Sequence, residues 1–213
     1  MHQRRFAPLI LAALAALAVV AAARTATVGQ AAPAADQTLY LPYIIQGCGP
    51  TQLVADGGFE AGLPTTAWQA QSSAGSLIID NTDPPPAHSG TWKAWLGGDN
   101  HIDETLSQTL TVPDTSARLV VSYWWLVSTE ESSHPFDTLR VEIRDANNQA
   151  LETLQILTDG DARASYQASA FTLSSAYAGQ TIRLAFVAHT DESNTTSFFI
   201  DDVSVMKYCT AQP

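Results

Sequence analysis

Hydrophobic and polar residues alternate in many short runs of this chain, and this pattern predicts β-strands. Residues 139–143 place Leu, Val and Ile between charged neighbours, and residues 182–186 repeat the pattern. Successive side chains of a strand point to opposite faces, so each run predicts one buried face and one solvated face. Residues 119–127 are apolar on both faces apart from Ser122. That run predicts either a central strand covered on both sides or a strand that presents aromatic rings to a ligand.

The same reasoning extends along the chain and predicts an all-β fold. A turn is predicted at residues 145–149, because Asn tolerates a positive φ. Helix signals are nearly absent. A chain with nine to eleven strands and no helices is typical of an antiparallel sandwich or barrel. The remaining predicted strands are residues 77–80, 92–96, 106–112, 151–157, 166–173 and 198–206.

The first 38 residues are expected to lie outside this domain. Residues 1–23 resemble a cleaved export signal, with Arg4 and Arg5 before an apolar stretch that ends in small residues. The alternative is an uncleaved membrane anchor, but the stretch is short and Ala-rich for a span. Residues 24–38 have almost no large apolar side chains and predict a disordered spacer. A single domain is expected at residues 39–209. The protein is expected to be secreted, either released or associated with the cell surface.

Charge and cysteine content fit an extracellular protein. The net charge is −11, and loss of Arg4 and Arg5 with the signal makes it −13. This balance disfavours nucleic acid and anionic lipid as partners, and it favours cations or neutral ligands. The two cysteines, Cys48 and Cys209, bracket the folded region. In an oxidising compartment they are most simply one disulfide, and two free thiols are the alternative.

Two adjacent carboxylates interrupt the apolar closing strand. Strict alternation places Asp201 on one face with Phe199 and Val203, and Asp202 on the other face with Ile200. One of the two acids is therefore expected to point toward the core, and alternation does not say which. A buried, unpaired carboxylate costs several kcal/mol. We therefore expect it to be neutralised by a cation, by Lys or Arg, or by backbone N–H groups.

Several of these segments together resemble a known family. Asp-Gly-Gly-Phe-Glu at 56–60, Ser-Gly-Thr-Trp-Lys-Ala-Trp-Leu-Gly-Gly at 89–98 and Ile-Asp-Asp-Val at 200–203 are similar to the galactose-binding-like, carbohydrate-binding jelly rolls of secreted bacterial proteins. The resemblance runs from about residue 52 to 206. It implies a jelly-roll β-sandwich. Such modules bind sugars, mediate adhesion or pack against a catalytic neighbour, so the fold does not decide the function.

The resemblance also implies a structural Ca²⁺ ion. Carried over by position, its ligands are the Gly58 carbonyl and the carboxylates of Glu60 and Asp201, with help from the loop 89–93. Such oxygen atoms are the ligands that Ca²⁺ prefers. The alternative is a buried Asp201 that accepts hydrogen bonds from backbone amides or pairs with Lys93.

Sugar binding needs aromatic rings on the surface, next to polar groups. By alternation Trp92 and Trp125 belong to the core, so Trp95 and Trp124 are the expected ligand-binding rings. The alternative is that all five tryptophans pack the sandwich.

Residues 132–137 contain Ser, His and Asp but no nucleophile elbow or oxyanion signature, so we expect no enzyme. The predicted function is a secreted, non-catalytic module for carbohydrate or a cell-surface polymer; the alternative is a structural, adhesion or protein-interaction module without a small ligand.

Overall fold

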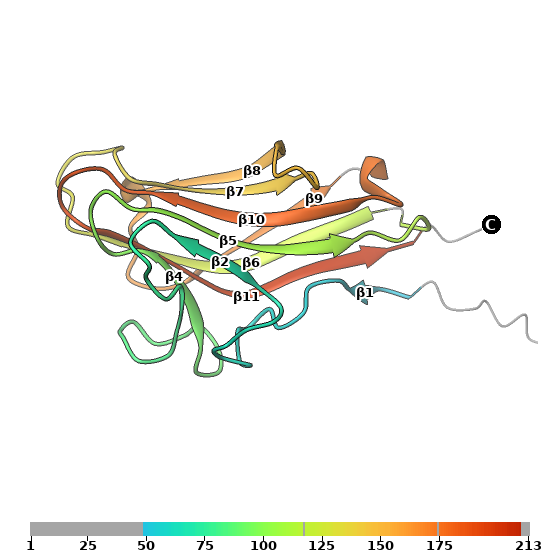
Figure 1. Ribbon diagram of the computed structural model, residues 1–213, viewed down its shortest axis with the longest axis horizontal. Coiled ribbons are helices and arrows are strands. Elements are labelled where there is room, and N and C mark those ends of the chain that lie inside the picture. The colour runs from blue at the N-terminus through green and yellow to red at the C-terminus, as the bar shows by residue number, and fades with distance from the viewer. Residues whose placement is uncertain (1–48, 117, 174, 210–213) are drawn as a thin grey trace, which may run out of the picture. The chain divides into compact units, whose positions relative to one another are not determined.

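The structure, a computed structural model, describes residues 49–116, 118–173 and 175–209. The expected export signal at 1–23, the spacer at 24–38 and the domain start at 39 lie outside these residues and stay predictions. Within the described residues, two antiparallel sheets pack face to face, as Figure 1 shows. The predicted jelly-roll β-sandwich is confirmed.

One layer is a six-stranded sheet. Its strands follow the order β3–β4–β11–β6–β9, and β1 pairs with β11 outside this path. The first strand of the domain therefore lies beside the last one. The bounds are β1 Thr51–Gln52, β3 Ile79–Asp80, β4 Lys93–Gly97, β6 Arg118–Thr129, β9 Gln167–Leu173 and β11 Thr196–Tyr208.

The other layer is a five-stranded sheet in the order β2–β5–β10–β7–β8. The core lies between the two layers, where alternate residues such as Val121, Val141 and Phe186 are fully buried. Two short 3₁₀ turns, η1 Asp159–Asp161 and η2 Ser175–Tyr177, follow β8 and β9. The strands are β2 Gln69–Ser72, β5 Asp103–Thr111, β7 Thr138–Arg144, β8 Ala150–Thr158 and β10 Thr181–His189.

Every strand that the alternation pattern predicts is present, and the predicted turn at 145–149 forms with Asn148 at a φ of 67°. Two strands were not predicted. β1 has only two residues, and the residues of β2 are mostly exposed, so neither has an apolar face. None of the described helices has the length and hydropathy to cross a membrane.

A β-bulge in β11 overturns the alternation that the sequence predicted around Asp201. The register against β6 shifts between Asp201 and Ser204, and Asp202 adopts a φ of 48°. An extra residue in a strand reverses which face the following side chains occupy. Val203 therefore joins Ile200 in the core, whereas Asp201 lies on the outer face. Neither acid points between the sheets, so that prediction is wrong.

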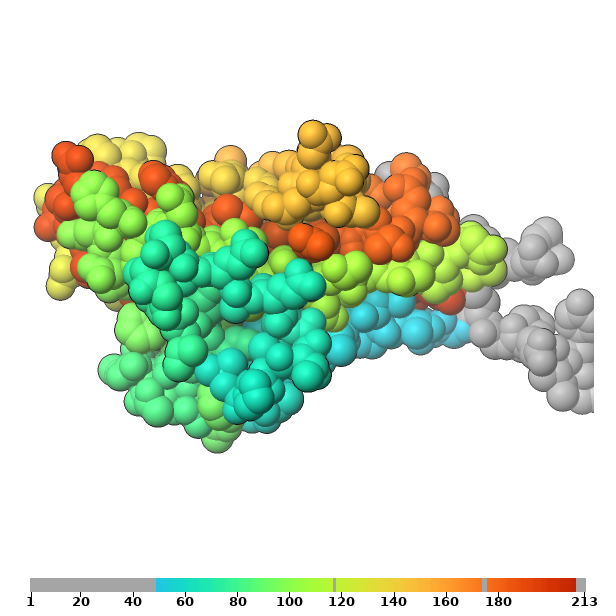
Figure 2. Space-filling model, in the orientation of Figure 1, coloured from blue at the N-terminus to red at the C-terminus, as the bar shows by residue number. Residues whose placement is uncertain are grey.

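The segment between β1 and β4 covers part of this outer face. Figure 2 shows a lobe of cyan to green atoms from this segment on the lower side of the molecule, whereas β2 of the same segment pairs with β5 in the other sheet. Asp201 is on the outer face yet has no exposed surface. Its burial therefore comes from this covering segment and not from the core.

Candidate functional site

The Asp-Gly-Gly-Phe-Glu segment docks directly on the bulge of β11. The Val203 N–H donates to the Gly57 carbonyl at 2.9 Å. A β-carbon on Gly57 would lie 1.9 Å from the Val203 carbonyl oxygen, so no larger residue fits without movement of the backbone. The glycine thus brings the residues that follow it, Gly58 and Glu60, beside the closing strand.

Asp201 is held by backbone amides. Its Oδ2 accepts the Ser89 N–H at 3.1 Å, and its Oδ1 accepts the Asp202 N–H at 2.7 Å. Burial raises the pKa of Asp201 to about 6, and the neighbouring Asp202 charge adds to this. The two amides only partly offset the cost of burying the charge.

Glu60 binds the same covering loop from its other side. Its Oε1 accepts the N–H groups of Thr91 and Trp92 at 2.8 and 2.9 Å, and its Oε2 accepts the Thr91 hydroxyl at 3.1 Å. The Trp92 and Thr91 amides lower the pKa of Glu60. A β-carbon on Gly90 would lie 2.2 Å from Glu60 Oε1, so the loop closes tightly around this carboxylate.

The structure brings together the three residues expected to bind calcium. A β-carbon on Gly58 would lie 3.9 Å from Asp201 Oδ1 and 3.8 Å from Glu60 Cγ. The donors are oxygens, which suits Ca²⁺, but backbone amides already occupy the carboxylates. In the described part of the chain, no three Asp, Glu, His or Cys side chains gather in a group that could hold a metal.

Lys93 does not neutralise Asp201, so that alternative is wrong. Its Nζ donates to Asp80 Oδ2 at 2.6 Å and to the Asp83 carbonyl at 2.8 Å. The other alternative, hydrogen bonding by backbone amides, is what the structure contains.

Trp124 lines a cavity on the outer face of the six-stranded sheet, directly opposite Asp201 in the register of β6 and β11. Its ring stacks on the imidazole of His88, with 3.8 Å between centroids and 15° between planes. His88 Nδ1 lies 2.5 Å from Asp202 Oδ2, so the acidic bulge positions the ring that covers Trp124. The cavity measures about 420 Å³ and is lined by Pro85, Pro86, Ala87, His88, Trp124, Leu126, Ala164, Ser165 and Tyr166.

Tyr166 contributes an unused polar group to this cavity. Its ring meets His88 edge-on at 5.5 Å, and its hydroxyl is buried without a hydrogen-bond partner. Burial raises the pKa of Tyr166, and the charges of Asp201 and Asp202 raise it further. The neutral hydroxyl can therefore donate a hydrogen bond to a ligand.

Trp95 lies on the same outer face but does not line this cavity. It is half-buried against Phe199, at 5.7 Å between centroids. Gly98 lies close to its ring, since a β-carbon there would be 2.7 Å from the indole. Its Nε1 is buried without a partner. The structure therefore does not bring the two expected ligand-binding tryptophans into one site. As expected, Trp125 is in the core and Trp92 packs against it.

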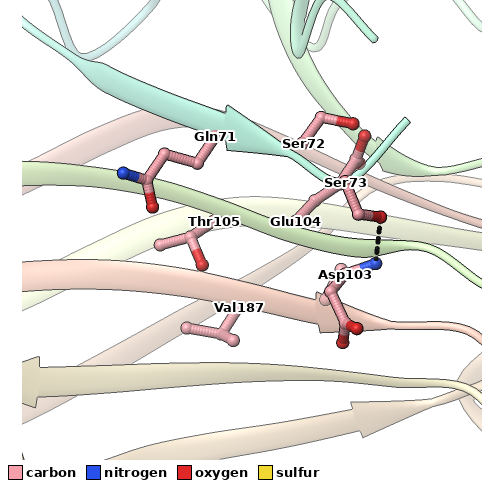
Figure 3. A pocket seen from close by; sticks show the side chains of 8 residues that line it. Gln71, Ser72, Ser73, Asp103, Glu104, Thr105 and Val187 are labelled. Atoms are coloured by element: carbon pink, nitrogen blue, oxygen red, sulfur yellow. Dashed lines mark hydrogen bonds between the residues drawn. The ribbon is translucent and has the colours of Figure 1, made fainter. Parts of the chain in front are cut away.

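A second cavity, of about 310 Å³, lies at the five-stranded sheet. Figure 3 shows its lining on three neighbouring strands, with Gln71 from β2, Thr105 from β5 and Val187 from β10. Ser73 Oγ accepts the Asp103 N–H at 3.0 Å. Glu104 also lines this cavity; its Oε2 accepts the Gly97 N–H at 2.9 Å, and its Oε1 is buried without a partner. The sequence did not point to this cavity.

The Ser, His and Asp residues at 132–137 do not form a catalytic set. His134 Nδ1 lies 3.0 Å from Asp159 Oδ2, and Asp137 Oδ1 accepts the Asp191 N–H instead. Of the expected cysteine pair, Cys48 lies outside the described residues. Thr51 lies opposite Lys207 in the β1–β11 register, two residues before Cys209. The disulfide stays a prediction.

Comparison with known proteins finds similarity at the level of the fold. No protein-family model matches the sequence. No curated protein matches it either. The solved structure of TmCBM61 in complex with β-1,4-galactotriose is 14% identical, and the match covers 74% of this chain and 99% of that chain with a TM-score of 0.56. The stig cyclase Fisc from Fischerella sp. TAU is also 14% identical, over 76% and 100% of the two chains, with a TM-score of 0.50.

A third solved structure, the CBM22-1 xylan-binding domain of Paenibacillus barcinonensis Xyn10C, is 16% identical over 77% and 96% of the chains, with a TM-score of 0.42. At such low identities the likeness concerns the fold and not the ligand. Of the two structures named above with a TM-score of at least 0.50, TmCBM61 is a carbohydrate-binding module and Fisc is a cyclase. The chain thus has the jelly-roll β-sandwich fold of carbohydrate-binding modules, as the resemblance implied.

Proposed function

We propose that the protein is a secreted, non-catalytic carbohydrate-binding module that holds a neutral sugar in the Trp124 cavity. The observation that carries this proposal is the buried Tyr166 hydroxyl, which has no partner and lines the cavity beside the His88–Trp124 stack. Carbohydrate sites combine aromatic surfaces with a few placed polar groups. A sugar hydroxyl that accepts from Tyr166 would satisfy a donor that is otherwise unpaired.

His88 decides how a sugar reaches the aromatic surface. Because its ring covers one face of Trp124, the sugar contacts the part of the indole that lines the cavity together with Tyr166. Pro85 and Pro86 form a stiff apolar wall that loses little entropy on binding. The carboxylate of Asp202 remains hydrogen-bonded to His88 and need not contact the sugar.

The test is a binding screen against neutral polysaccharides, beginning with β-1,4-galactan and xylan. Trp124→Ala and Tyr166→Phe should weaken the binding of a retained polymer by about tenfold or more, with the melting temperature of Tyr166→Phe unchanged. Trp95→Ala tests the separate prediction that Trp95 also contacts the polymer. If Trp124→Ala bound every neutral polymer as tightly as the native protein does, the sugar would not bind in this cavity.

Calcium is the second part of the proposal. The Gly58 carbonyl and the carboxylates of Glu60 and Asp201 would hold the ion, which would supply positive charge beside a buried acid. The raised pKa of Asp201 supports this, because a cation would relieve the cost of ionising it. Chelator should then lower the melting temperature, and added Ca²⁺ should restore it. Asp201→Asn should abolish this response. Identical melting temperatures in chelator and in Ca²⁺ would mean that backbone amides alone, and no ion, stabilise the Asp201 carboxylate.

A protein-interaction module is the alternative. The feature that favours it is edge strand β8, where Leu151 is 49% exposed and Ile156 is 56% exposed. Exposed apolar side chains on a sheet edge are suited to protein contact. Replacement of both by Thr should abolish binding to a partner protein if this function holds, and it should leave sugar binding intact if the first proposal holds.

A further inference from the structure

The outer face of the five-stranded sheet differs chemically from the Trp124 cavity. Among the residues of β2, β5, β7, β8 and β10 the only Phe, Tyr or Trp is Phe186, which is fully buried in the core. The imidazole of His189 lies at the end of β10, with its Nδ1 atom 2.8 Å from Asp103. This face therefore offers no Phe, Tyr or Trp ring on which a neutral sugar could stack. It carries arginine, hydroxyl and amide side chains instead.

Strand β7 presents two arginines on this face, because its alternate residues Val141 and Ile143 are fully buried. Arg140 Nε donates to Glu142 Oε1 at 2.9 Å, and Arg144 Nη2 lies 2.7 Å from Glu142 Oε2. Burial opposes ionisation of Glu142, but the hydrogen bonds from Arg144 and Arg140 outweigh it and lower its pKa. Glu142 thus stays charged and holds both guanidinium groups in place.

A third arginine lies on the neighbouring strand. Arg183 of β10 is directly opposite Arg144, and opposed residues of paired strands share a face. Its Nη1 donates to Asn148 Oδ1 at 3.3 Å, and its Nε is buried without a hydrogen-bond partner. Arg140 donates to Glu142 through Nε and has further donors on its Nη atoms. The face therefore holds guanidinium donors that the protein uses only in part.

The charge of this face is opposite to that of the whole protein. Three arginines and Glu142 leave a local excess of two positive charges on a chain with a net charge of −11. The nearest acids in the hairpin and at the strand ends have partners: Asp145 accepts the N–H groups of Asn147 and Gln149, and Asp103 lies 2.8 Å from His189. Both acids keep their negative charge, but neither forms an ion pair with one of the three arginines.

The arginine face adjoins the cavity of Figure 3. Val187, which lines that cavity, lies opposite Arg140 in the β7–β10 register, and Thr105 lies opposite Val187 on the other side. One row of side chains therefore leads from Gln71 at the cavity to Arg140. An extended ligand could place a charged group at the arginines and hydroxyl groups along Thr105 and Gln71.

We propose that the outer face of the five-stranded sheet is a binding site for a carboxylate-bearing polysaccharide, a polyuronate, with Arg140 and Arg183 as its carboxylate-binding residues. A guanidinium group matches a carboxylate in shape and charge, and its hydrogen bonds to charged acceptors are stronger than neutral ones. Glu142 positions Arg140 and does not contact the ligand. The site is independent of the Trp124 cavity, which lies on the other sheet. The acidic remainder of the protein repels polyanions in general, so a polyuronate must bind through local contacts with these arginines, and the more densely charged nucleic acids are disfavoured further.

Polygalacturonate and its fully methyl-esterified form test this proposal, because the two polymers differ in charge but share a backbone. The native protein should bind polygalacturonate and not the ester, and binding should weaken as salt rises. Arg140→Gln and Arg183→Gln should each reduce the affinity about tenfold. Arg118→Gln is the matched control, since it removes an exposed arginine of β6 in the other sheet. Trp124→Ala should bind polygalacturonate as the native protein does.

If Arg183→Gln lowers the melting temperature, the affinity of Arg140→Gln is the informative measurement. The Arg140 side chain is 39% exposed, and Arg144 still pairs with Glu142 after Arg140 is replaced. Wild-type affinity in Arg140→Gln would overturn the proposal. So would absence of polygalacturonate binding, equal binding of the methyl ester, or equal binding of dextran sulfate, which would indicate attraction by charge alone. Loss of polygalacturonate binding in Trp124→Ala would also overturn it, because both ligands would then share one site.

Discussion

The imidazole Nδ1 atom of His88 lies 2.5 Å from Oδ2 of Asp202, 114 residues further along the chain. The same imidazole stacks on Trp124. The bulge in β11 thereby connects to the aromatic cavity through one side chain. Asp202 has this geometry only because it adopts a positive φ, which Asp and Asn tolerate better than other non-glycine residues.

Asp202→Asn should loosen the stack between His88 and Trp124 and leave the fold intact. Asn tolerates the same backbone conformation but lacks the charge that strengthens the hydrogen bond. The His88 ring protons should lose part of the upfield NMR shift that stacking causes. Asp83→Asn is the control, because it removes a charge from the loop that carries His88, and the Asp83 carboxylate accepts from the Thr82 hydroxyl instead. Unchanged His88 shifts in Asp202→Asn would contradict this role of Asp202.

Gly57→Ala should destabilise the protein by about 1–3 kcal/mol, the usual cost of overpacking, or by more. The added methyl group would overlap the Val203 carbonyl oxygen, a backbone atom that cannot rotate away. Gly49→Ala is the matched control, because no atom lies within 4 Å of the β-carbon position there. Urea unfolding gives the comparison, and equal midpoints for the two variants would mean that the bulge adjusts freely.

Glu104 should make the protein less stable as pH rises. Burial raises the pKa of its carboxyl above the model-compound value of 4.5, although hydrogen bonds from Ser72 and Gly97 partly oppose this. The folded state therefore favours the neutral form, so the contribution is fully present below pH 4.5 and is lost as pH rises through the raised pKa. Glu104→Gln should remove this slope. Parallel curves of unfolding free energy between pH 4 and 7 for native protein and variant would disprove it.

The predicted Cys48–Cys209 disulfide should leave the exported, unreduced protein without a reactive thiol, even after denaturation. Closing a loop of this length adds about 4–5 kcal/mol in the chain-entropy model. Cys209→Ser should therefore lower the stability markedly in non-reducing buffer and change little in reducing buffer. Two thiols that react in the denatured, unreduced protein would rule out the bond.

Much of the fold could be predicted from the sequence because it depends on alternation. Residues 139–143 and 182–186 each bury one face, and the structure contains both strands as β7 and β10. Strand β2 could not be predicted in this way, since its residues form an edge strand with no apolar face. Asp201 and Val203 were wrongly placed on one common face because alternation assumes a regular strand, and a bulge leaves no hydrophobic signal of its own.

The candidate site was predictable only in part. Alternation correctly placed Trp124 on the outer face, but it said nothing of the loop that covers its ring. His88 and Tyr166 are far apart in the sequence and meet only after β6 and β9 pair. The three consecutive prolines before His88 could have indicated a stiff segment near the ligand, although not its target. The role of Glu142 between two arginines follows from the strand alternation and could have been seen.

The most direct test of the account is an NMR titration of the five tryptophan indole N–H signals with neutral oligosaccharides, beginning with β-1,4-galactotriose and xylotriose. Replacement of single tryptophans by Phe assigns the signals. A sugar that binds in the cavity should shift the Trp124 signal and leave those of Trp68 and Trp125 in place, because these two rings are buried in the core. Binding that leaves the Trp124 signal unmoved, or failure of every neutral oligosaccharide to shift it at millimolar concentration, would contradict the proposed function.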